Sequence, residues 1–106
     1  MPKISIQELQ RTLLIDIDRI SWFEADGNNT RLTLSDGTKI LSTKILKYFS
    51  ERLHEKGFHR IHAKYLVNLA HIYSYSRGKS ITVKMLCQTG LPVSARKKSG
   101  FLKSVP

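Results

Sequence analysis

Basic and apolar side chains alternate along residues 58–72, FHRIHAKYLVNLAHI. At a period of two, Arg60, His62 and Lys64 fall on one side of an extended chain and apolar residues on the other, because successive strand side chains point to opposite faces. The pattern predicts one long strand with a core face and a face that binds an anion. It is also typical of ordinary solvated charges beside a structural histidine, so the pattern alone leaves both interpretations open.

Two further stretches carry side chains that suit a nucleic acid. Asn28, Asn29 and Thr30 lie at a predicted turn, and the amide of an asparagine matches the hydrogen-bonding edge of adenine. Taken alone, the same three residues fit plain turn chemistry better. Residues 95–98, ARKK, form a basic cluster that is either a frayed tail or, if Phe101 anchors the chain beyond it, a ligand site held in place.

Catalysis and metal binding have weaker support. Asp16 and Asp18 have no third ligand nearby and are typical turn and cap residues. On one strand, His59 and His62 face opposite sides and cannot converge on one ion or proton. We therefore expect no catalytic residue, no metal site and no cofactor.

The charge is unevenly distributed. Eighteen Lys and Arg against eight Asp and Glu give a formal net charge of +10, and residues 54–106 hold ten of the basic residues but only one acid. An excess of positive charge in one half of the chain is expected to attract polyanions. The single cysteine, Cys87, excludes an internal disulfide and a Cys-rich zinc site. Since no apolar run could span a bilayer and no secretory segment is evident, we expect a cytoplasmic protein without a membrane partner.

The elements that position these residues are mostly short strands. Alternating or β-rich runs bounded by turn residues predict further strands at 3–7, 13–17, 21–25, 31–34, 38–41, 73–75, 81–86 and 91–94, with a single helical turn at 69–72. Ser42 as N-cap, apolar residues at helical spacing and Gly57 as C′ residue predict one main helix at about 43–56. The 106 residues form one domain, mainly β, with small antiparallel sheets and one main α-helix.

Three stretches together resemble the LytTR domain, the DNA-binding output module of bacterial response regulators of the LytR and AlgR type. They are WFEADGNNTRLTLSDG at 22–37, the helix with FHRIHAKYLVNLAHI at 44–72, and LPVSARKK at 91–98, and order and spacing match from about residue 4 to 103. The resemblance implies that residues 1–106 are a single LytTR-like domain with a β-β-β arrangement of small sheets. It also implies that loops, not a recognition helix, enter successive major grooves of double-stranded DNA.

By matching positions, the resemblance implies three regions of DNA contact. They are Asn28, Asn29 and Thr30; the segment after His62 that holds Ala63 and Lys64; and Arg96 with Lys97 and Lys98. We expect Arg96 to read a guanine, whose O6 and N7 acceptors match a guanidinium, and Asn29 to read a second base. The lysines are expected to contact phosphates. His62 is expected either to join them or to buttress the Lys64 segment, while Arg60 and Asn68 tie turns together.

Departures from the family fall at the positions that would read bases. Asn29 stands where an aromatic residue is common, and Ala63 and Ala95 stand where basic residues are common, so no relative's operator can be transferred. The chain also lacks the acidic phosphorylation pocket of a receiver domain. It is therefore either an excised output domain of a two-component response regulator or a free-standing regulator, and tandem or two-fold sites could recruit a second copy.

The sequence thus predicts a bacterial transcriptional regulator that binds duplex DNA sequence-specifically. The alternative is a non-specific polyanion-binding module for RNA or an anionic surface, for which the charge of residues 54–106 would suffice.

Overall fold

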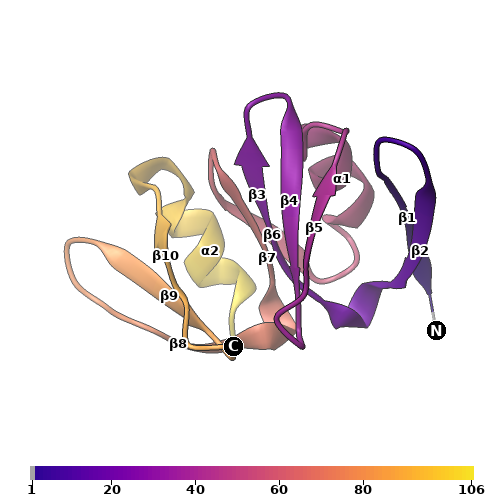
Figure 1. Cartoon of the computed structure of the whole chain (residues 1–106). Helices are drawn as coiled ribbons and strands as arrows, with labels where there is room; N and C mark the ends of the chain where they lie inside the picture. The colour runs from indigo at the N-terminus through magenta and orange to yellow at the C-terminus, as the bar shows by residue number, and fades with distance from the viewer. Residues whose placement is uncertain (1) are drawn as a thin grey trace.

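A five-stranded antiparallel sheet lies at the centre of the structure, a computed structural model that describes residues 2–106 (Figure 1). Across the sheet the strands are β5 (Lys39–Ser42), β4 (Asn29–Leu34), β3 (Ile20–Asp26), β7 (Tyr65–Asn68) and β6 (Phe58–His62). The three strands β3, β4 and β5 form a meander, as their alternating sequences and the turn residues between them predict. β3 is the middle strand, so it pairs with both β4 and β7.

Two smaller antiparallel sheets flank the central one. β1 (Lys3–Gln7) and β2 (Thr12–Asp16) form a hairpin at one end of the molecule, and β8 (Ile72–Tyr75), β9 (Ile81–Met85) and β10 (Gly90–Val93) form a three-stranded sheet at the other (Figure 1). Short 3-10 turns link the sheets, η1 (Ile17–Arg19) between β2 and β3 and η2 (Leu69–His71) between β7 and β8, while a third, η3 (Ala95–Lys97), follows β10. The predicted mainly β class with small antiparallel sheets is confirmed. No helix within residues 2–106 is long and apolar enough to cross a membrane.

The central sheet has a separate core on each face. Phe23 of β3 stacks on Phe49 of helix α1 (Leu46–Leu53), with ring centroids 4.8 Å apart. Its neighbour Trp22 points to the other face and joins a second core with Phe101 of helix α2 (Lys98–Ser104) and the three-stranded sheet. Burying each such aromatic side chain contributes about 1.5–3 kcal/mol. Alternation along one strand therefore joins two hydrophobic cores into a single unit.

The prediction of one long strand over residues 58–72 is wrong. β6 ends at His62, the chain reverses at Ala63 and Lys64, and β7 runs back beside β6 before η2 and β8 follow. A two-residue turn alone would shift the alternation by one residue, because the paired His62 and Tyr65 share a face, but the register shift between Arg60 and His62 restores the period-two pattern. Neither turn residue is Gly, Asn or Asp, so the sequence pattern does not mark the turn.

The main helix exists but is shorter than the predicted 43–56. Ser42 ends β5, and its Oγ accepts a hydrogen bond from the Lys44 backbone N–H at 3.2 Å instead of capping the helix. The helix begins at Leu46 and ends at Leu53, and the chain then turns through Gly57 at a φ of +87°. A second helix, α2, was not predicted. It buries Phe101 completely, so the cluster at residues 95–98 is held in place and is not a frayed tail.

Candidate nucleic-acid interface

Three loops that are distant in sequence lie along one edge of the molecule, which we call the loop edge. They are the β3–β4 turn at residues 27–28, the β6–β7 turn at residues 63–64, and η3 at the end of β10, all on the upper side of Figure 1. Backbone hydrogen bonds join them: Ala25 N–H donates to the Lys64 carbonyl, and Ser94 N–H donates to the Ile61 carbonyl, each at 2.8 Å. The fold therefore assembles one continuous surface from the three regions that the sequence singled out.

The β3–β4 turn presents amides to solvent. Gly27 has a φ of +60°, a conformation that glycine adopts without a steric penalty. Asn28 is exposed and Asn29 partly exposed, and no hydrogen bond between described residues uses either side-chain amide. Arg31 donates to Asp26 at 2.8 Å and braces the base of the turn. Both amides are therefore free to meet a ligand.

Thr30 does not belong with its two neighbours. Its side chain is completely buried, and its Oγ1 donates to the Lys44 carbonyl at 2.7 Å. The hydroxyl ties the β3–β4 hairpin to the segment that leads into α1. We therefore withdraw Thr30 from the predicted contact residues, because a buried and satisfied hydroxyl cannot reach DNA.

The β6–β7 turn is held by two side chains of β6. His62 Nδ1 accepts a hydrogen bond from the Lys64 backbone N–H at 3.1 Å. Arg60 donates from Nε to the His62 carbonyl at 3.1 Å and from Nη2 to the Ala63 carbonyl at 2.6 Å. An accepting Nδ1 requires the neutral tautomer with its proton on Nε2. The predicted buttressing role of His62 and the predicted turn-tying role of Arg60 are thus confirmed.

Asn68, the other residue expected to tie turns, does so in the interior. It is buried, its Nδ2 donates to the Ile20 carbonyl at 2.9 Å, and its Oδ1 accepts from the Ala70 N–H at 3.0 Å. One amide therefore fixes the start of β3 against the η2 turn that follows β7. The interaction supports the sheet that carries the loop edge.

Lys64 is exposed at the tip of the β6–β7 turn. Its Nζ lies 3.7 Å from Glu24 Oε2, an ion pair between two partly or fully solvated side chains. Exposed pairs of this kind contribute only about 0–1 kcal/mol. The ammonium can therefore exchange Glu24 for a phosphate at little cost.

Arg96 and Lys97 extend from η3 into solvent. The backbone that carries them is fixed by the Ser94–Ile61 bond and by a 3.0 Å bond from Lys97 N–H to the Ser94 carbonyl. No ion pair within residues 2–106 uses either side chain. Lys98 differs, since it is half-buried and its Nζ donates to the Gly78 carbonyl at 2.9 Å, which ties α2 to the β8–β9 loop.

The cations of the loop edge also act on a nearby histidine. His59, on β6, is partly buried, and burial followed by the positive charge of Lys97 lowers its pKa below the ordinary value of 6.5. Burial likewise lowers the pKa of Arg60 from its ordinary value, although a guanidinium stays charged at any physiological pH. The region therefore holds positive charge in excess of its local counter-charge.

The two aspartates weighed for catalysis take part in contacts within the fold. Asp16 pairs with Lys3 at 3.2 Å, and the Asp18 backbone carbonyl lies 2.8 Å from His71 Nε2. Within residues 2–106, no three His, Cys, Asp or Glu side chains gather closely enough to hold a metal ion. These residues lie away from the loop edge and do not add to it.

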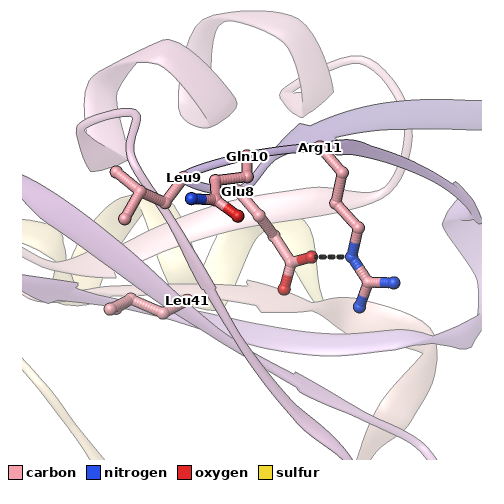
Figure 2. A pocket seen from close by; sticks show the side chains of 5 residues that line it. All are labelled: Glu8, Leu9, Gln10, Arg11 and Leu41. Atoms are coloured by element: carbon pink, nitrogen blue, oxygen red, sulfur yellow. Dashed lines mark hydrogen bonds and ion pairs between the residues drawn. The ribbon is translucent and has the colours of Figure 1, made fainter.

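A separate groove lies between the β1–β2 turn and strand β5. Figure 2 shows Leu9 and Leu41 on its two sides and the Glu8–Arg11 pair, in which Arg11 Nε donates to Glu8 Oε1 at 2.6 Å. Its charges are paired with each other, and it lies at the opposite end of the molecule from η3 (Figure 1). It has no part in the loop edge.

Comparison with known proteins places the chain in a family. Residues 10–105 match the family model described as the LytTr DNA-binding domain, and the chain belongs to this family. A search of curated proteins gave no match. Among solved structures, the LytTr DNA-binding domain of a Bacillus cereus protein described as a methyl-accepting/DNA response regulator has a TM-score of 0.81 at 19% sequence identity, over 96% of this chain and 94% of that one.

The family assignment confirms the resemblance that the sequence shows. It gives the chain the general function of DNA binding. The family is defined by DNA binding and not by catalysis.

Proposed function

We propose that the domain binds duplex DNA sequence-specifically by inserting the loop edge into the major groove. The observation that carries the proposal is that backbone hydrogen bonds join the three loops while their outermost side chains stay unpaired. Within residues 2–106, no hydrogen bond or ion pair uses the side chains of Asn28, Asn29, Arg96 and Lys97. A rigid edge with unpaired donors and acceptors is what base reading requires, because the ordering cost is met during folding and not on binding.

The side chains divide into base readers and phosphate contacts. Arg96 offers a guanidinium fork to guanine O6 and N7, a pairing worth about 1–3 kcal/mol of discrimination. Asn29, with Asn28 beside it, is the candidate reader of a second base. Lys64 and Lys97 contact phosphates and orient the domain without reading sequence.

Two predicted contacts take changed roles in this proposal. His62 acts mainly through the turn that presents Lys64, with its Nε2–H left as a donor. Lys98 contributes charge near the phosphates, but it first has to release the Gly78 carbonyl to contact one directly. Thr30 makes no contact.

The wider setting follows from the same proposal. The domain works on chromosomal DNA in the bacterial cytoplasm, as a regulator by itself or behind a receiver domain of a two-component system. Tandem or two-fold sites would seat a second copy on the same duplex. The competing function is non-specific polyanion binding, which the basic charge of residues 54–106 favours.

Selection from a randomised duplex pool at two salt concentrations separates the two functions. We expect a motif that persists at the higher salt and loses one defined position with Arg96→Ala. Arg77→Ala, an exposed arginine in the β8–β9 loop outside the loop edge, serves as the matched control and should keep the motif. Binding that yields no motif and falls equally for both variants would establish the non-specific function instead.

A further inference from the structure

A cleft with a basic lining lies beside the loop edge, between α1, β6 and the η3–α2 segment. Its volume is about 510 Å³, within the range of roughly 300–1,000 Å³ typical of small-ligand sites. No carboxylate lines it. Its polar lining consists of Ser50, His54, His59, Arg60, Arg96 and Lys97.

The positive charges around the cleft lack counter-charges. Arg96 and Lys97 take part in no ion pair within residues 2–106. The Nε and Nη2 atoms of Arg60 are committed to carbonyls of the β6–β7 turn. Glu55 approaches His54 at 3.7 Å, but both side chains are mostly exposed and neither neutralises the η3 side of the cleft. Like charges held together without a partner disfavour each other, and a bound anion relieves that repulsion.

The buried wall of the cleft carries a further sign of an unmet interaction. His59 Nε2 is buried without a hydrogen-bond partner among the described residues, and it lies against the backbone of Gly100. Burial and then the positive charge of Lys97 lower the pKa of His59, which disfavours the protonated imidazole. An anion close to Lys97 would offset that charge and favour the protonated imidazole.

We propose that this cleft binds a phosphate group, held by Lys97 on the η3 side, next to Arg96, and faced by His54 at the C-terminal end of α1 on the other. The proposal rests on the proposed function, since Arg96 and Lys97 belong to both the loop edge and the cleft. The DNA strand contacted by η3 would supply the phosphate from its backbone. A free phosphate compound has the same chemistry and is the other source.

A backbone phosphate in the cleft would extend the DNA interface to α1. The helix then acts as a clamp on the strand and not as a reader of bases. A fixed phosphate next to η3 sets the distance at which Arg96 meets the base edge, so it positions the reading residue.

Ser50 offers a substitution that fills the cleft with the protein's own charge. It is half-buried on α1, one helical turn before His54, so Ser50→Glu places a carboxylate among the cations. Ser50→Gln has the same shape without the charge and is the matched control. Lys97→Gln removes a proposed ligand and replaces Ser50→Glu in the test if that variant does not fold. Its control is Lys84→Gln on β9.

The first arm of the test uses inorganic phosphate alone. The NMR titration of the His59 imidazole is followed at constant ionic strength, with chloride as the reference anion. Phosphate should raise the pKa of His59 in the wild type and in Ser50→Gln, and should have no such effect in Ser50→Glu or Lys97→Gln. Identical titrations in phosphate and chloride would overturn a site for free phosphate.

The second arm uses a duplex carrying the selected motif, with a neutral methylphosphonate placed at one backbone position at a time. One position beside the base read by Arg96 should weaken binding about tenfold in the wild type and Ser50→Gln, as expected for one charge-assisted contact. Ser50→Glu should be weakened about as much already and lose its sensitivity to that position.

The outcomes separate this proposal from the proposed function. Specific duplex binding that is insensitive to every methylphosphonate and equal in Ser50→Glu and Ser50→Gln would overturn the backbone source while leaving sequence reading intact. A phosphate response of His59 without any selected motif would retain the cleft as a site for a free phosphate compound and reject the proposed function. Absence of both effects would overturn the cleft.

Discussion

Removal of the Arg60 side chain is expected to loosen the β6–β7 turn and weaken DNA binding together. The guanidinium donates two hydrogen bonds, to the carbonyls of His62 and Ala63, at 3.1 and 2.6 Å. Hydrogen bonds to charged groups contribute about 1.5–3 kcal/mol each, but the exposed bond contributes less than this range because water replaces it when it is lost. We therefore expect Arg60→Ala to lower the free energy of unfolding by roughly 2–3 kcal/mol.

The assay combines stability, local order and affinity. Urea unfolding can be followed by the fluorescence of Trp22, the only tryptophan, which is buried beside the second core. The Lys64 amide should exchange with solvent faster, because its acceptor His62 lies on the loosened turn. Affinity for the selected duplex should fall up to about tenfold, since ordering the turn on binding would cost up to about 1.4 kcal/mol.

Two variants sharpen the interpretation of this experiment. Arg60→Lys keeps the charge but not the planar fork, so it should recover only part of the lost stability. Arg77→Ala removes an exposed arginine outside the loop edge and should leave stability, amide exchange at Lys64 and duplex affinity unchanged. If the free energy of unfolding of Arg60→Ala lies within about 0.5 kcal/mol of the wild-type value and amide exchange at Lys64 is unchanged, Arg60 does not hold the β6–β7 turn.

Three further predictions follow from single side chains. Thr30→Val should lower the free energy of unfolding by about 1–2 kcal/mol in urea titrations, because the Lys44 carbonyl loses its donor, while duplex affinity stays unchanged. Phe101→Ala should lower it by about 3–5 kcal/mol and release η3, measured as lost protection of the Ser94 amide. Because His59 has a lowered pKa in the folded state, the unfolded state binds its proton first, so stability should fall as the pH drops below about 6.5, and His59→Gln should flatten that fall in urea midpoints.

The elements that could be predicted are those with local signals. The β3–β4–β5 meander alternates apolar and polar residues and turns at Gly27 and Gly37, whose positive φ values suit glycine. The β6–β7 reversal could not be seen, because its order comes from Arg60 and His62 and not from turn residues. The conformation of this turn depends on hydrogen bonds from these side chains, and the sequence pattern indicates only that the side chains are basic.

Long-range packing decided the remaining differences. Helix α2 contains Gly100 and four lysine or serine positions with little periodic pattern, and it is held by burial of Phe101 in a core built from other segments. The burial of Thr30 depends on the path of the chain at Lys44, fourteen residues away. His54, at the C-terminal end of α1, lines the same cleft as η3. The only sequence signal for this is that Ser50 and His54 are four residues apart and so lie on one helical face.

The most direct test of the account is an NMR titration of the isotopically labelled domain with a duplex that carries the selected motif. We expect the largest amide shifts in three separate stretches, at residues 26–29, 62–64 and 94–97, and small shifts along β1, β2 and the β1–β2 turn. A duplex of unrelated sequence should give weaker shifts that vanish with added salt. Dominant shifts at the Leu9–Leu41 groove, or shifts of equal size with both duplexes, would contradict reading of DNA by the loop edge.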